Sequence, residues 1–221
     1  MPTLTDAQWQ SIAKRSPDDI PALMAFLHCP AAQAIPERIS QALAVPLECT
    51  TAIPAHDGVL WSRRLLQHFR QTDGKVALVD GEALRYASQS ENTWRRMAAY
   101  LGARRLARAL ARRVQRSQLE VVLDLAGPDA LQFARRPLLD DPLVLDDTQE
   151  WSNEQIAACL MPGGLACLQR SFEALPPALA WRGCLRLPAP PDTENHTVPP
   201  AEVLWPICLA LAKELNSSWF S

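Results

Sequence analysis

The sequence predicts a mainly α-helical fold. Ala and Leu supply 65 of the 221 residues, whereas the β-branched Ile and Val supply 17. This balance favours helices, because β-branched side chains are enriched in strands. Hydrophobic residues make up 48% of the chain and charged residues 21%, which is typical of a folded protein and unlike a disordered one. We expect a single globular helical domain over 1–221, within which the N-terminal segment 1–57 can pack more loosely.

The first third of the chain predicts short helices. Thr5 can cap a helix over 5–15, and residues 16–19 offer a second start with a serine cap, a proline and two acids. Four prolines within 29–58 predict short turns and loops that end at His56-Asp57-Gly58. A longer helix is expected next from three apolar residues spaced four apart, Trp61, Leu65 and Phe69.

Three glycines punctuate the middle of the chain. Gly81, Gly102 and Gly127 each follow apolar residues and precede a helical turn rich in Ala or Leu. Glycine often follows the last residue of a helix, where it lets the chain reverse. The pattern therefore predicts hairpins of helix, glycine and helix.

The segment 92–119 carries eight arginines and no acid. From Ala103 onward, an apolar face opposes an arginine stripe with spacings of three, four and four residues, which predicts one amphipathic helix. The apolar face consists of Leu106, Ala107, Leu110 and Val114, and the stripe consists of Arg105, Arg108, Arg112 and Arg116.

This arginine stripe has three interpretations. It can be a solvated face partly neutralised by the chain's own acids, a docking face for an acidic protein, or a nucleic-acid surface over Arg95–Arg116. The formal net charge of −2 and the lack of aromatic residues within the stripe count against nucleic acid. The four stripe residues are the candidate partner-binding site.

An acidic loop is predicted after the arginines. Residues 138–169 hold six acids and no basic residue, and prolines and paired aspartates mark the beginning of this stretch as exposed. The pairs Asp140-Asp141 and Asp146-Asp147 could hold Mg²⁺, or they are solvated charge. A helix is expected to resume at Ser152 or Asn153.

The last third predicts helices separated by one extended segment. A helix closes at Pro176-Pro177, and Trp181–Leu187 alternates apolar and basic residues as a short strand does. A proline-rich loop over 188–200 precedes a final apolar helix that is expected to begin near Pro206 or to bend there.

No pattern indicates catalysis or a cofactor. The sequence has no phosphate-binding glycine loop, and its four histidines lack the spacing of a helical zinc pair. Nothing resembles an export signal or a membrane span, so we expect reduced thiols at the six scattered cysteines. These are Cys29, Cys49, Cys159, Cys167, Cys184 and Cys208.

Several short motifs, taken in order, resemble one protein family. They are Phe26 with Cys29-Pro30-Ala31-Ala32; Gly81-Glu82-Ala83-Leu84-Arg85; Gly164-Leu165-Ala166; Trp181-Arg182-Gly183-Cys184-Leu185-Arg186-Leu187-Pro188; and an apolar C-terminal helix ending in Trp219-Phe220. The chain resembles the SctK family, the YscK-type accessory proteins of bacterial type III secretion systems.

The resemblance implies a non-enzymatic adaptor of the secretion sorting platform, with no cofactor. Such a protein joins the pod formed by the SctQ scaffold, the SctL stator and the SctN ATPase to the cytoplasmic domain of the inner-membrane ring protein SctD. It is implied to lie in the bacterial cytoplasm, docked at the inner membrane through the apparatus. The first alternative function is that of a helical nucleic-acid-binding protein that uses the basic helix Arg95–Arg116, and the second is that of an enzyme of unknown type built on a helical scaffold.

Overall fold

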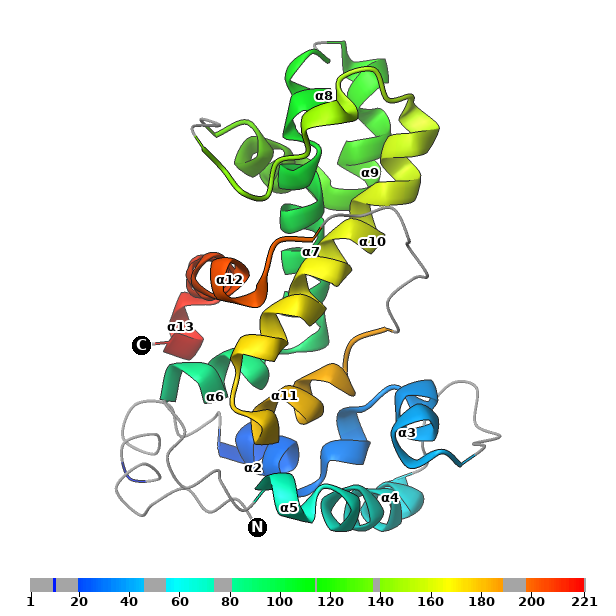
Figure 1. The fold of residues 1–221 in the computed structure, drawn as a ribbon, viewed down its shortest axis with the longest axis vertical. Helices are drawn as coiled ribbons and strands as arrows, with labels where there is room; N and C mark the ends of the chain where they lie inside the picture. The colour runs from blue at the N-terminus through cyan, green and yellow to red at the C-terminus, as the bar shows by residue number, and fades with distance from the viewer. Residues whose placement is uncertain are drawn as a thin grey trace. The chain divides into compact units, whose positions relative to one another are not determined.

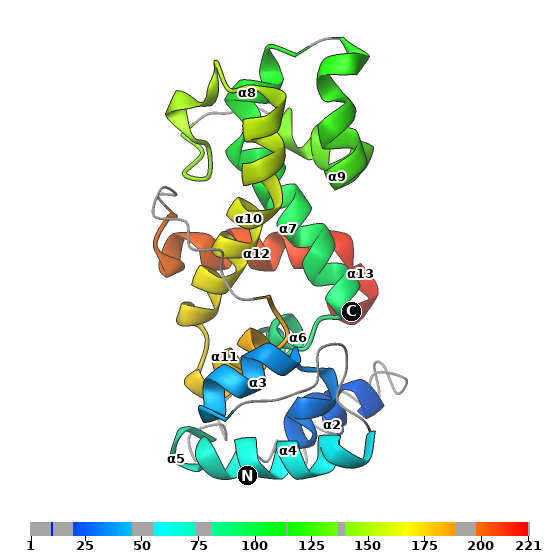
Figure 2. The ribbon, with the colours of Figure 1, turned by 90° about the vertical axis from the view of Figure 1, so that its right-hand side faces the viewer.

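Every regular element among the described residues is a helix (Figures 1 and 2). The structure is a computed structural model that describes residues 10, 20–45, 55–73, 81–113, 115–136, 140–188 and 198–220. The prediction of a mainly α fold is confirmed. The helix expected over 5–15 and the start at 16–19 lie outside the described residues, as do most of the loop 188–200 and Cys49.

Contacts divide the chain into two compact units. The first unit comprises residues 1–91, 172–189 and 212–221, and the second comprises 92–171 and 190–211. The first holds α2 (Ile20–His28), η2 (Pro30–Gln33), α3 (Pro36–Leu43), α4 (Ala55–His68), α5 (Arg70–Asp73), α6 (Gly81–Ala87), η5 (Phe172–Ala174), α11 (Pro177–Cys184) and α13 (Ser217–Phe220). The second holds nearly all of α7 (Glu91–Arg105), α8 (Ala107–Ala111), α9 (Arg116–Ala134), η4 (Asp146–Thr148), α10 (Asn153–Ser171) and most of α12 (Ala201–Leu215).

The core of the first unit contains the predicted apolar stripe of α4. Leu65 is fully buried, and Trp61 and Phe69 pack against the same cluster. The ring of Phe69 stacks on that of Trp181 with centroids 4.4 Å apart. The stripe is confirmed, with Phe69 one residue past the end of α4. Helix α4 begins at Ala55, so residues 56–58 are helical and do not form the end of the loop that the prolines predicted.

The extended segment predicted at Trp181–Leu187 is wrong. Residues up to Cys184 belong to α11, and Leu185 also has helical backbone angles. Alternation predicts a strand only if the charged residues face water, and here they do not, because Arg182 is 1% exposed and Arg186 is 9% exposed. Burial lowers the pKa of Arg186 to about 10.

Arginine side chains tie α11 to α2 and to α3 within the first unit. Arg182 donates to the carbonyl of Leu27 from Nε and Nη2 at 3.3 and 3.2 Å, and to the carbonyl of Ala178 from Nη1 at 2.7 Å. Leu27 lies in the last turn of α2, whose final carbonyls have no partner inside the helix. Arg38 on α3 donates from Nε to the carbonyl of Cys184 at 3.1 Å.

Two glycines bring α7 and α10 into close contact in the second unit. A Cβ at Gly102 would overlap the carbonyl oxygen of Leu160, and one at Gly164 would overlap that of Ala98. Because the two contacts run in opposite directions along the chain, the helices cross antiparallel, with backbone against backbone. The role predicted for Gly102 is therefore wrong, since α7 continues through it to Arg105.

The other helix boundaries follow local chemistry. Gly127 has a φ of 83° and interrupts α9 before Pro128, close to the predicted reversal. Ser152 and Gln155 cap α10 reciprocally, each side chain accepting from the other's backbone N–H. The start predicted there is confirmed. Helix α12 begins at Ala201, five residues before Pro206.

We predict that Gly164→Ala destabilises the protein by several kcal/mol, because a methyl group would push apart two backbones that touch. The matched control is Gly58→Ala in α4, where the nearest atom to an added Cβ lies 4.0 Å away. Alanine there should leave stability unchanged or raise it by up to about 1 kcal/mol. Urea denaturation measures both, and equal midpoints would contradict the close approach.

Candidate protein-interaction site

The arginine-rich segment does not form the single amphipathic helix that its spacing predicts. Helix α7 ends at Arg105, Leu106 leaves the helical conformation, and α8 is five residues long. Like charges four residues apart disfavour a continuous helix. The break also frees the carbonyl of Arg105, which accepts from the N–H of Leu145 at 2.9 Å. The predicted stripe is therefore wrong, because its residues lie on three separate helices.

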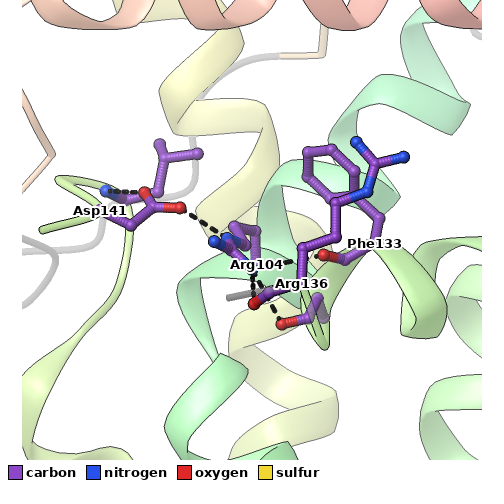
Figure 3. Close-up of polar contacts among 6 residues, drawn as sticks. Arg104, Phe133, Arg136 and Asp141 are labelled. Atoms are coloured by element: carbon purple, nitrogen blue, oxygen red, sulfur yellow. Dashed lines mark hydrogen bonds and ion pairs between the residues drawn. The ribbon is translucent and has the colours of Figure 1, made fainter. Parts of the chain in front are cut away.

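Arg104, which the stripe did not include, makes the central contacts of this segment (Figure 3). Its side chain is 7% exposed, and its Nε lies 2.6 Å from Oδ2 of Asp141. Its Nη1 donates to the carbonyls of Ala134 at 3.1 Å and Arg136 at 2.7 Å, at the end of α9. One guanidinium thus holds the loop carboxylate and the end of a helix together.

The acidic loop lies along the arginine-rich segment over residues 140–152. Asp146 pairs with Arg108 at 2.7 Å, with side chains 77% and 44% exposed. Arg113 donates to the carbonyl of Trp151 through Nη2. These contacts confirm the interpretation that the chain's own acids partly neutralise its arginines. The acidic loop and the arginine-rich segment therefore share one surface, on which opposite charges lie side by side.

Arg105 is unavailable to a partner. It is 2% exposed, and its Nη1 lies 3.6 Å from the sulfur of Cys167, to which it donates. Burial raises the pKa of the Cys167 thiol, and the positive charge of Arg105 opposes that effect. Its place in the predicted docking face is wrong, because the side chain is buried beside Cys167 of α10 instead of facing solvent.

Two of the predicted site residues remain at the surface. Arg112, at the C-terminal end of α8, is exposed, and Arg108 is partly so despite its ion pair. The side chain of Arg116 lies outside the described residues. Arg108 on α8 and Arg112 at its end therefore remain exposed, and Arg108 pairs with the exposed carboxylate of Asp146.

A groove that sequence reasoning missed adjoins this surface. It has a volume of about 570 Å³ and lies between the acidic loop and the start of α12. Residues 142–151 and 199–203 are far apart in sequence, so periodicity could not reveal it. Its lining combines apolar and acidic side chains, namely Pro142, Val144, Leu145, Asp146, Asp147, Thr148, Trp151, Pro199, Pro200 and Val203.

The described residues contain no group of three or more His, Cys, Asp or Glu side chains arranged to hold a metal ion. Five cysteines are free thiols: Cys29, Cys159, Cys167, Cys184 and Cys208. Among the helices whose residues are described, none combines the length and the apolar character needed to span a bilayer. Comparisons with family models, curated proteins and solved structures each give no significant match.

We predict that Arg104→Ala destabilises the protein by about 3–5 kcal/mol, because it leaves Asp141 and the carbonyls at the end of α9 without their donor. Arg108→Ala, four residues on, removes an exposed ion pair and should cost less than about 1 kcal/mol. Urea denaturation of both variants tests the difference. Similar losses in the two would contradict the central role of Arg104.

Proposed function

We propose that the chain is a non-enzymatic adaptor of a bacterial type III secretion sorting platform. In this role it links the pod of SctQ, SctL and SctN proteins to the cytoplasmic domain of the ring protein SctD. It would then be docked at the cytoplasmic face of the inner membrane through the apparatus, without inserting into the bilayer.

The observation that carries this proposal is the ordered set of motifs that resembles the SctK family. Many residues of these motifs are buried, including Phe26, Leu84, Gly164 and Arg182. Arg182 holds the end of α2, and Gly164 sets the crossing of α7 and α10. The resemblance therefore concerns residues that determine packing, so it supports a shared fold first and a shared role through that fold.

We assign partner contacts to the exposed arginines whose charge is not fully taken up by an ion pair within the chain. Arg112 has an exposed side chain and no ion pair within the described ranges, and Arg108 shares its charge with Asp146. Arg105 is excluded by burial. A partner with an acidic patch fits this surface, since complementary charges favour encounter and register.

No observation favours the nucleic-acid alternative, so we do not propose it. A duplex-binding surface needs several arginines free to reach phosphates. Arg104 and Arg105 are buried, and Arg108 is paired. Binding to random duplex DNA with a steep loss at rising salt would support that alternative and contradict the adaptor proposal.

We predict that the purified chain co-purifies with the SctQ protein and with the SctD cytoplasmic domain of its own bacterium, and that Arg112→Glu weakens one of these complexes about tenfold. Arg112 is a cleaner probe than Arg108, whose reversal would also break the pair with Asp146. Titration by isothermal calorimetry measures the affinities.

The matched control is Arg96→Glu, which makes the same charge change at an exposed position of α7. It should bind both partners as the wild type does. If neither protein binds the wild-type chain, the proposed function is wrong. If both bind the Arg112→Glu variant normally, the adaptor proposal stands and the contact surface lies elsewhere.

A further inference from the structure

A second groove lies in the first unit, between the end of α2 and one face of α4. Its volume is about 660 Å³. Helix α4 lines it with residues that recur at helical spacing, and α2 contributes its last turn. The described lining residues are His28, Cys29, Val59, Ser62, Arg63, Leu66, Gln67 and Arg70.

Core packing and a buried hydrogen bond hold α4, which forms one wall of this groove, in place. Leu65 of α4 is fully buried, whereas Leu66 beside it lines the groove. The hydroxyl of Ser62 accepts from the N–H of Ala31 at 3.1 Å, a buried bond that ties α4 to η2. The groove is therefore formed before any partner arrives, which lowers the entropic cost of binding.

The charge of the groove is positive. Arg63 and Arg70 are exposed, and within the described ranges neither guanidinium has an ion pair. No acid is among the described lining residues. Burial and the nearby charge of Arg182 lower the pKa of His28, so that ring is neutral at neutral pH and adds no charge. The two arginines set the sign of the surface.

Exposed apolar side chains lie on the two helices that form the groove. Val59, which lines it, is 67% exposed, and Leu60 beside it is 49% exposed. Met24, one turn before His28 on α2, is 42% exposed. Only one other large apolar residue among those described is as exposed, Leu125 in the second unit. Three of these four residues therefore lie on α2 and α4, and apolar exposure concentrated in one region is typical of an interaction site.

We propose that this groove binds an acidic amphipathic helix of a partner protein. On α4 the lining residues Val59, Arg63 and Leu66 follow at i, i+4 and i+7, the spacing with which one helix packs against another. A helix whose apolar side chains enter between α2 and α4 would bring its flanking carboxylates to Arg63 and Arg70.

This inference does not rest on the proposed function. The groove belongs to the first unit, whereas the surface around Arg112 belongs to the second. Each surface can therefore be tested and lost without the other.

The test is fluorescence polarisation of the full chain with a labelled, lactam-bridged helical peptide of about 18 residues. The peptide carries leucines at i, i+4 and i+7 with flanking glutamates, and a matched peptide carries lysines in their place. The wild-type chain should bind only the acidic peptide. The double variant Arg63→Glu, Arg70→Glu should bind it at least about tenfold more weakly, because two attractions become repulsions.

The control variant Arg96→Glu reverses an exposed charge in the second unit, outside both proposed surfaces, and should bind the acidic peptide normally. Val59→Ser should weaken binding without changing the melting temperature, since the side chain is 67% exposed. Bound peptide should also slow alkylation of Cys29 in the groove and leave that of Cys159 unchanged.

Three results would overturn the inference. The first is that the acidic peptide does not bind, and the second is that it binds the Arg63→Glu, Arg70→Glu variant as tightly as the wild type. The third is self-association of the wild-type chain in sedimentation that this double variant abolishes, which would assign the groove to a second copy of the chain. If the double variant has a changed melting temperature, the peptide affinity of Val59→Ser and the alkylation rate of Cys29 test the inference instead.

Discussion

Arginine side chains that turn inward to bind backbone carbonyls are the interaction on which both units depend. A fold made of many short helices has many ends, and each end leaves carbonyls without a helical partner. Arg182 serves the end of α2, and Arg104 serves the end of α9. A guanidinium offers five donors in a fixed plane, so one side chain can bind several oxygens at once.

The need for donors at helix ends gives the excess of arginine over lysine a structural role. The chain has 19 arginines and 3 lysines. A lysine at position 104 would carry one compact ammonium group and could not reach the carboxylate and the helix-end carbonyls together. A bias toward arginine in composition would not by itself place Arg104, Arg105 and Arg182 in the interior, where all three are buried.

The sequence predicts those elements whose polar residues face water. The apolar spacing of Trp61, Leu65 and Phe69 and the cap at Ser152 depend on local chemistry, and both predictions are confirmed. The same reasoning fails at 103–116 and 181–187, where it assumes that charged side chains are exposed. Periodicity cannot reveal that Arg105 or Arg182 turns inward, because their partners are distant in sequence. Both grooves were missed for a similar reason, since each joins segments that are far apart in the chain.

The arginines available to a partner are therefore those that remain exposed and have no ion pair within the chain. A count of charges along the sequence overestimates their number. Eight arginines in 92–119 predict a strongly basic face, yet Arg104 and Arg105 are buried and Arg108 is paired. Arg63 and Arg70, in a less conspicuous stretch, are exposed without an ion pair in the described ranges. A cation already held by a carboxylate must give up that pair before it can attract another acid, whereas an unpaired cation loses only water. Electrostatic recognition therefore depends more on the few arginines that have no ion pair among the described residues than on the densest run of arginines.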